Sequence, residues 1–114
     1  MADCIFCKIA AKEVPSQIVA EDDQVVAFRD ANPQAPVHVL VIPKSHIANV
    51  AAAEKGDESL LGHILRVGAQ VATEAGVAQG GYRMVLNRGP DAGEAVPHIH
   101  LHVIGGRALE WPPG

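Results

Sequence analysis

Residues 98–104 of the chain read HIHLHVI. Successive side chains of a strand point to opposite faces, so His98, His100 and His102 are expected on one face and the apolar residues between them on the other. We predict a strand over residues 98–104 whose apolar face packs on the core and whose imidazole face lies along a cleft or in solvent. Packing would favour other residues over three imidazoles, and a solvated face needs none of them. This strand is therefore interpreted as part of a catalytic or metal-binding site.

A single metal ion does not account for all three imidazoles of this strand. By strand rise the first and the third lie about 13 Å apart, whereas zinc binds nitrogen at about 2 Å. Imidazole can also attack phosphorus, because one ring nitrogen acts as the nucleophile while the other donates a hydrogen bond that fixes the tautomer. The Gly-rich loop at residues 88–95 can offer backbone N–H groups to phosphate oxygens, although most such stretches are only turns.

The remaining sequence predicts an α+β fold. Residues 37–42 (VHVLVI) are apolar on both faces and end at Pro43, which is typical of a central strand. A long helix is expected from a cap at Asp57 or Ser59 to Ala75, with Gly76 as its stop. We predict an antiparallel sheet of about five strands with one long and one short helix. The predicted strands are 17–21, 24–29, 37–42, 82–87 and 98–104, the short helix is 4–12, and residues 49–55 form a helical turn.

Length and composition limit the class of protein. A chain of 114 residues fits one domain. Its 48% hydrophobic residues, 19% charged residues and net charge of −4 exclude a disordered chain and argue against non-specific nucleic-acid binding, which needs clustered Lys and Arg. No apolar run approaches the roughly 18 residues of a membrane span, and the first ten residues do not read as a signal peptide. We expect a cytoplasmic protein with neither nucleic acid nor a membrane as a partner.

Cys4 and Cys7 form a C-x-x-C motif close to the N-terminus. In a reducing compartment this motif indicates metal binding or a redox pair, and two inert buried thiols are the remaining interpretation. Structural zinc takes four ligands from Cys and His. His46 directly after the central strand and His98 at the start of the triad strand can complete such a site, although spacing alone does not choose among the six His.

Several separate segments resemble one known family. HIHLHVI fits the pattern of the histidine triad (HIT) family, in which His alternates with apolar residues. The resemblance extends from Cys4 to Gly114, so a single HIT domain over residues 4–114 is expected. The segments that resemble its Hint branch are FRDANPQAPVHVLVIPKSHI (28–47), DESLLGH (57–63), GYRMVLN (81–87) and HVIGGRALEWPPG (102–114).

The resemblance implies a fold, an activity and a catalytic set. Hint-like proteins are α+β homodimers that bind purine nucleotides such as AMP and GMP. They hydrolyse nucleoside 5′-phosphoramidates or aminoacyl-adenylates. By this resemblance His100 is the nucleophile that becomes nucleotidylated, and His102 contacts the phosphate. His38 is a cleft His that supports them, and His98 is the first member of the triad.

The same resemblance implies a binding site and a zinc site. Asp30 matches the residue that binds the ribose hydroxyls, and Trp111 matches a residue that can reach a partner subunit's site. Bacterial-type members of the family pair C-x-x-C with two His on zinc, which correspond here to Cys4, Cys7, His46 and His98. The base pocket corresponds to Ile5, Phe6, Ile9, Phe28 and Ala31, and the phosphate and leaving-group side to Asn87, Gly93, Glu94 and Ala95.

Two departures from the family pattern keep other functions open. Ala95 stands where many Hint proteins have a Ser that bonds the leaving-group nitrogen, so that Glu94 or water must substitute. Ala31 is smaller than the Ile often found there. The alternatives are a nucleotide sensor or adaptor with little turnover, a dinucleoside polyphosphate hydrolase like the Fhit branch, and a redox or metal-storage protein built on the Cys pair. His63 is interpreted as a surface residue.

Overall fold

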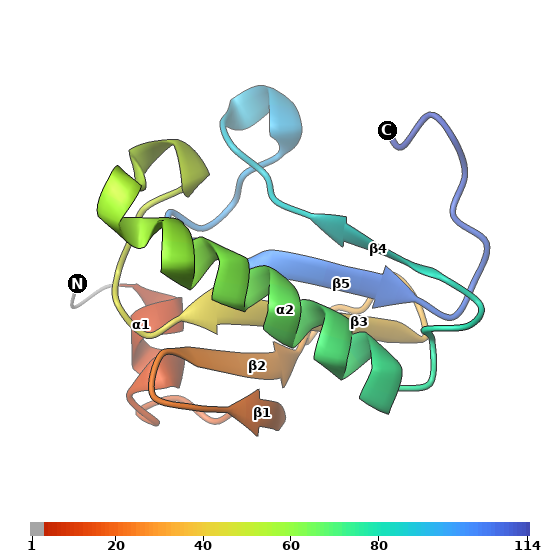
Figure 1. Ribbon diagram of the computed structural model, residues 1–114, viewed down its shortest axis with the longest axis horizontal. Helices are drawn as coiled ribbons and strands as arrows, with labels where there is room; N and C mark the ends of the chain where they lie inside the picture. The colour runs from red at the N-terminus through yellow and green to blue at the C-terminus, as the bar shows by residue number, and fades with distance from the viewer. Residues whose placement is uncertain (1–3) are drawn as a thin grey trace.

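The computed structural model describes residues 4–114 and shows one five-stranded antiparallel sheet with two helices (Figure 1). The spatial order of the strands is β1-β2-β3-β5-β4. This confirms the predicted α+β fold. The elements are α1 (Ile5–Ala10), β1 (Ile18–Glu21), β2 (Val25–Arg29), β3 (Val37–Pro43), α2 (Glu58–Glu74), β4 (Tyr82–Val85) and β5 (Leu101–Gly105), with short 3-10 turns η1 (Val50–Ala52), η2 (Lys55–Asp57) and η3 (Pro90–Ala92).

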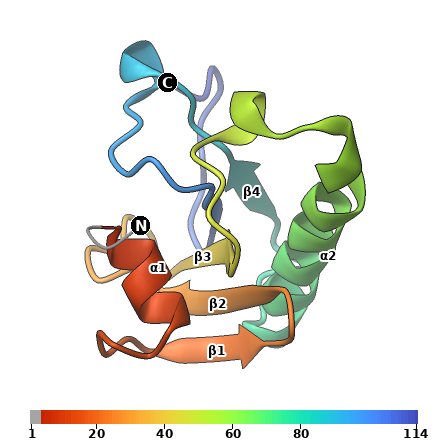
Figure 2. The same ribbon diagram turned by 90° about the vertical axis from the view of Figure 1, so that its left-hand side faces the viewer.

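The two helices cover opposite faces of the sheet (Figure 2). Alternation along β2 and β3 divides their side chains into two buried clusters, because neighbouring residues of a strand face opposite ways. Val26, Phe28, Leu40 and Ile42 pack with Phe6 and Ile9 of α1. The other face packs on α2 through Val25, Ala27, Val39, Val41, Ile64, Val67, Val71 and Ala72. The double-sided burial expected for the central strand is thus present.

The strand that carries the triad is shorter than predicted. β5 begins at Leu101, so His98 and His100 precede it rather than lie within it. Leu101 pairs with Val41, and two residues further along this register Ile99 would lie opposite Pro43, which has no N–H to donate. Ile99 instead donates its N–H to the carbonyl of Ile47 at 2.8 Å. The alternation of faces nevertheless continues, since Ile99, Leu101 and Val103 are all buried in the α2-side core.

The boundaries of the helices also differ slightly from the prediction. Cys4 is the N-cap of α1, and Lys12 has a left-handed φ of 64° that ends the helical path. Asp57 is the cap residue of α2, one of the two predicted alternatives, but its carboxylate accepts from the N–H of Glu54, which precedes η2. β4 ends at Val85, two residues before the predicted end.

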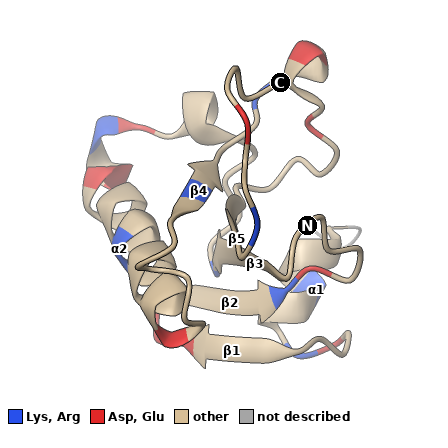
Figure 3. Ribbon diagram, turned by 90° about the vertical axis from the view of Figure 1, so that its right-hand side faces the viewer, with Lys and Arg blue, Asp and Glu red and all other residues tan. Residues whose placement is uncertain are grey.

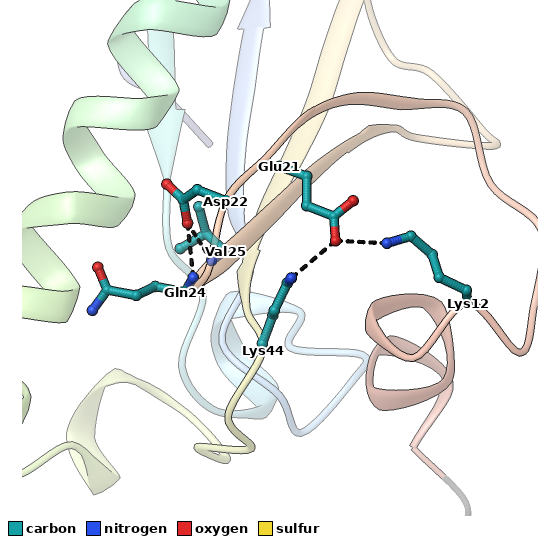
Figure 4. A network of polar contacts seen from close by, with 6 residues as sticks. All are labelled: Lys12, Glu21, Asp22, Gln24, Val25 and Lys44. Carbon is teal, nitrogen blue, oxygen red and sulfur yellow. Dashed lines mark hydrogen bonds and ion pairs between the residues drawn. The ribbon is translucent and has the colours of Figure 1, made fainter.

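Charged side chains brace one corner of the fold (Figure 4). Glu21 at the end of β1 pairs with Lys12 after α1 at 2.6 Å and with Lys44 after β3 at 2.9 Å. These two ion pairs lower the pKa of Glu21. The remaining Lys and Arg are spread over several elements (Figure 3). Over residues 4–114 no helix combines the length and apolar character needed to cross a membrane.

Candidate functional site

A cavity of about 1080 Å³ is lined by residues of α1, β2 and β3 and by two members of the triad. The apolar part of its wall comes from α1 and β2, and its polar part from Asp30, His38, His100 and His102. Ala95 also lines it. The structure therefore gathers most of the predicted binding residues around one space, with Ile5, Phe6, Ile9, Phe28 and Ala31 forming the predicted base-binding side.

His100 is held in one tautomer. Its Nδ1 lies 2.7 Å from the backbone carbonyl of His98, and because a carbonyl can only accept, Nδ1 carries the proton. In the neutral ring Nε2 then has a free lone pair. Only 9% of His100 is exposed, and the residue lines the cavity. A buried imidazole with a bare nitrogen at a cavity wall is equipped to attack an electrophile.

A chain of directed hydrogen bonds orients His102. Nδ1 of His38 accepts from the backbone N–H of Gln34 at 3.0 Å, so neutral His38 has its proton on Nε2. That nitrogen lies 2.9 Å from Nδ1 of His102 and 3.3 Å from Oδ2 of Asp30. When His38 donates to His102, the proton of His102 is on Nε2, where it can be presented to a bound anion.

The electrostatic environment keeps His102 neutral. Burial lowers its pKa to about 4, together with the neighbouring His100 and His38, against a small opposing effect of Asp30. At pH 7 the ring is therefore uncharged, as the hydrogen bond from His38 requires. The ring centroids of His100 and His102 lie 5.1 Å apart, so one ligand phosphate can contact both.

Phe6 links α1 to the triad. Its ring meets Phe28 at a centroid distance of 5.7 Å, His98 at 5.9 Å and His100 at 5.0 Å, each edge to face. Such aromatic pairs stabilise a fold by more than their buried apolar area alone provides. Phe6 lies between Cys4 and Cys7 on α1, so one short helix presents both the cavity wall and the Cys pair.

Cys4, Cys7, His46 and His98 converge, with one ligand atom from each lying within 4.8 Å of the others. Nδ1 of His98 lies 3.3 Å from Sγ of Cys4, and Nδ1 of His46 lies 3.3 Å from Sγ of Cys7. A tetrahedral zinc would place sulfur and nitrogen about 3.6 Å apart. Burial and the neighbouring Cys4 raise the pKa of Cys7, so a thiolate here needs a cation beside it.

The second nitrogen of His98 also suits a metal ligand. Nε2 lies 2.9 Å from the carbonyl of Pro43 and therefore carries the proton, which leaves Nδ1 bare toward the two sulfurs. Metal-bound His commonly donates its other N–H in this way. Burial lowers the pKa of His98, which favours the neutral ring. The donor set and the tautomer both fit zinc.

Asp30, His38 and His102 form a second cluster of potential ligand atoms, but their tautomers do not suit a metal. Nδ1 of His38 already accepts the N–H of Gln34, so coordination through Nε2 would require a ring without any proton. This cluster is better described as a relay of hydrogen bonds.

In the loop between β4 and the triad, the side chain of Glu94 is bonded within the loop itself and does not join the hydrogen bonds of Asp30, His38 and His102. Oε1 of Glu94 accepts from the N–H of Gly89 at 2.8 Å and lies 3.4 Å from Arg88. Gly89 and Gly93 have positive φ values, 91° and 78°, which glycine adopts readily. Asn87, Gly93 and Glu94 do not line the cavity in the described chain, and Trp111 is 82% exposed in the C-terminal tail. Their binding roles stay predictions.

Sequence reasoning missed the backbone groups that orient the imidazoles. These are the N–H of Gln34 and the carbonyls of Pro43 and His98. Any residue type carries these groups, so no sequence signal marks them. The reasoning also missed that Val14, Pro15 and Ser16 line the cavity after α1. Finally, His63 pairs with Asp22 at 2.6 Å, which joins α2 to the β1–β2 turn.

Comparison with known proteins agrees with this geometry. The chain matches the HIT domain family over residues 11–109, a stretch that includes the triad but begins after Cys4 and Cys7. An uncharacterized HIT-like protein of Synechococcus elongatus is 52% identical over 112 residues, which cover 98% of this chain and 97% of the relative. A crystal structure of a HIT family hydrolase from Legionella pneumophila has a TM-score of 0.96 at 47% identity and covers 98% of this chain and 100% of that one. A histidine triad protein from Clostridium difficile has a TM-score of 0.93 at 44% identity and covers 96% of each chain. The chain thus belongs to the HIT domain family.

Proposed function

We propose that this protein is a purine nucleotide-binding hydrolase of the Hint branch. It cleaves nucleoside 5′-phosphoramidates or aminoacyl-adenylates through a nucleotidyl intermediate on His100. The observation that carries the proposal is the hydrogen bond from Nδ1 of His100 to the carbonyl of His98, which leaves Nε2 free at the cavity wall. The similar chain from Legionella pneumophila is described as a hydrolase, which agrees with the proposed class of activity.

Substrate binding uses the two kinds of wall. The base packs between apolar side chains of α1 and β2, and the carboxylate of Asp30 accepts from the ribose hydroxyls. Asp30 already accepts the N–H of Asn32 through Oδ1, which leaves Oδ2 toward the cavity side and His38. Phosphate binds against the triad. We assign residues 4–114 to a single HIT domain that forms this binding site.

The reaction has two steps. Nε2 of His100 attacks the α-phosphorus, a P–N bond to His100 forms, and the bond to the leaving amine or carboxylate breaks. Nε2–H of His102 and backbone N–H groups stabilise the negative phosphoryl oxygens. Water then attacks the same phosphorus and releases a proton to solvent, the bond to Nε2 breaks, and His100 regains its lone pair. An amine leaves only after it gains a proton, whereas a carboxylate leaves as the anion.

Zinc and a second subunit complete the proposed protein. Cys4, Cys7, His46 and His98 would hold Zn²⁺ as a structural ion, which supplies a cross-link between α1 and the triad segment. Thiolate ligands suit the cytoplasm, where thiols stay reduced. The outer edge of β4 and exposed Leu65 offer a strand edge and apolar surface to a second copy, which supports a homodimer. Sedimentation at micromolar concentration tests that assembly.

Turnover of a fluorogenic adenosine phosphoramidate tests the function. We expect His100→Ala to abolish hydrolysis while AMP still binds, because the pocket walls remain. Quenched samples of the wild type should show a protein mass increased by one nucleotidyl group. The matched control is His63→Ala, which removes an imidazole outside the cavity. Normal hydrolysis by His100→Ala would refute the nucleophile assignment.

One observation favours a second function, a nucleotide sensor with little turnover. Ala95 lines the cavity without a hydroxyl, and Glu94 beside it is occupied by Gly89 and Arg88. No proton donor to an amine leaving group is therefore evident at these two positions. Ala95→Ser separates the two functions: a large gain in phosphoramidate turnover, at unchanged AMP affinity, would assign the wild type to the sensor class.

A further inference from the structure

Three of the polar groups of His98, namely the two ring nitrogens and the backbone carbonyl, point in different directions. Nδ1 faces the sulfurs of Cys4 and Cys7 at 3.3 and 3.6 Å, and Nε2–H donates to Pro43 at the end of β3. Its backbone carbonyl accepts the proton that fixes the tautomer of His100. The residue is fully buried, with 0% exposure. A rotation of His98 therefore cannot occur without changes at the other contacts.

The short helix α1 depends on the same place. It has six residues, and helices this short do not hold themselves in water. Cys4 caps it by accepting the N–H of Cys7 at 3.4 Å. Phe6 of the same helix packs edge-on against His100, while Ile5 and Ile9 line the cavity. Whatever fixes the two Cys side chains also fixes one wall of the cavity and one contact of the nucleophile.

We propose that His98 and Phe6 are positioning residues that couple the Cys4–Cys7–His46–His98 site to the nucleophile. Zinc at this site then sets both the affinity for nucleotide and the reactivity of His100. This inference rests on the proposed function for its activity readout, but not for its spectroscopic one.

The physical reason is that one bound ion would fix both the ring and the backbone carbonyl of His98. When the four side chains bind zinc, the His98 ring and carbonyl are held, and His100 keeps Nδ1 protonated and Nε2 bare. Without that ion, His98 faces two thiols that can also form hydrogen bonds with each other or with water, and its backbone carbonyl is less well placed. His100 then samples both tautomers, and α1 no longer presents a fixed apolar wall.

The test compares zinc-loaded protein with protein freed of metal by a chelator, both shown to be folded by circular dichroism. We expect AMP to bind about tenfold more weakly without zinc, the loss of roughly one apolar side-chain contact. Nitrogen-15 spectra of the His100 ring should show one protonated and one bare nitrogen with zinc, and averaged signals without it. Asp22→Ala is the control for lowered stability: Asp22 contacts Gln24, Val25 and His63 rather than the cavity or the four Cys and His side chains, so this variant should leave both readouts unchanged.

A variant that keeps zinc guards against simple unfolding. Phe6→Leu should retain one zinc per chain by metal analysis, yet lower kcat by about tenfold or more, because small displacements of a catalytic group are costly. Its nitrogen-15 signals should also begin to average.

Equal AMP affinity and identical His100 spectra with and without zinc would overturn the coupling, as would the absence of zinc binding. If the zinc-loaded protein shows the ordered His100 tautomer but no hydrolysis of a phosphoramidate or an acyl-adenylate, the proposed function fails while the coupling stands.

Discussion

Nε2 of His38 lies 2.9 Å from Nδ1 of His102, and the opposite nitrogen of His38 accepts the N–H of Gln34. The backbone of one loop thereby dictates which nitrogen of His102 carries its proton. His38 is nearly inaccessible, at 6% exposure, so solvent does not supply an alternative partner. The tautomer of the His102 imidazole is a property of the fold at residues 34–38.

Replacement of His38 tests this relay. We expect His38→Leu to lower kcat on the order of 100-fold, the range typical of a lost proton-positioning group, while AMP affinity changes little. His38→Gln keeps an N–H donor at similar reach and should recover part of the rate. Steady-state kinetics and AMP titration measure both variants. Equal kcat for His38→Leu and wild type would show that His102 orients itself.

The fold was predictable where a local sequence pattern alone determines the element. The double-sided apolar run at 37–42 became β3, and Gly76 marks the end of α2 with its positive φ of 83°. The start of the triad strand was not predictable in the same way. It depends on Pro43 lying opposite Ile99. That position follows from the register of Val41 with Leu101 and cannot be read from the sequence of either strand alone.

Gly68 is a point of close approach between α2 and the sheet. A Cβ at this position would lie 2.8 Å from Cδ2 of Leu101, and 3.3 Å from Met84 and Val103. We expect Gly68→Ala to lower the free energy of unfolding by about 1 to 3 kcal/mol through overpacking, despite the better helix propensity of Ala. Urea denaturation measures the change.

Gly62→Ala on the same helix is the control for helix propensity. Nothing lies within 4 Å of its added Cβ, so this variant should gain about 0.5 to 1 kcal/mol. If both variants gained stability, the contact of Gly68 with Leu101 would not limit how close α2 packs.

Asp22 organises the β1–β2 turn and ties it to α2. Its Oδ1 accepts the N–H groups of Gln24 and Val25 at 2.8 and 2.9 Å, and its Oδ2 pairs with His63. Asp22→Ala should cost about 1 to 2 kcal/mol of unfolding free energy, because two donors lose their partner. Asp22→Asn keeps an oxygen acceptor and should cost only about 0.5 kcal/mol, the value of an exposed ion pair. Thermal unfolding of the two variants compares them; an equal loss would assign the whole effect to His63.

The candidate site was partly predictable because its side chains are chemically distinctive. Alternation put His100 and His102 on one face, and the Cys4–Cys7 motif indicated metal binding among other uses. Sequence could not choose His46 and His98 among six His, since the choice depends on the fold bringing these two rings next to the sulfurs of Cys7 and Cys4. Nor could it reveal that the carbonyl of His98 serves the nucleophile, because every residue has a carbonyl.

The stability of the protein should depend on pH through His102. Burial, with His100 and His38 nearby, lowers the folded-state pKa of this residue to about 4, whereas the unfolded value is about 6.5. Between these values the unfolded chain binds a proton that the folded chain does not, so the free energy of unfolding falls as the pH drops from about 6.5 toward 4. The slope from this one group stays below about 1.4 kcal/mol per pH unit, because the folded and unfolded chains differ by at most one proton there.

The window from pH 6.5 to 4.5 separates this effect from that of the carboxylates, and comparison with a His102 variant removes the contribution of His98, whose pKa burial also lowers. The carboxylates whose pKa the fold lowers, Glu21 and Asp22, lose their contributions only below their ordinary values of 4.5 and 3.8. Urea denaturation of wild type and His102→Asn at half-unit steps should give a shallower slope for the variant, because Asn does not titrate. Parallel slopes would mean that His102 takes up its proton equally in the folded and the unfolded chain. In that case burial and the hydrogen bond from His38 would not hold the His102 ring neutral below its ordinary pKa.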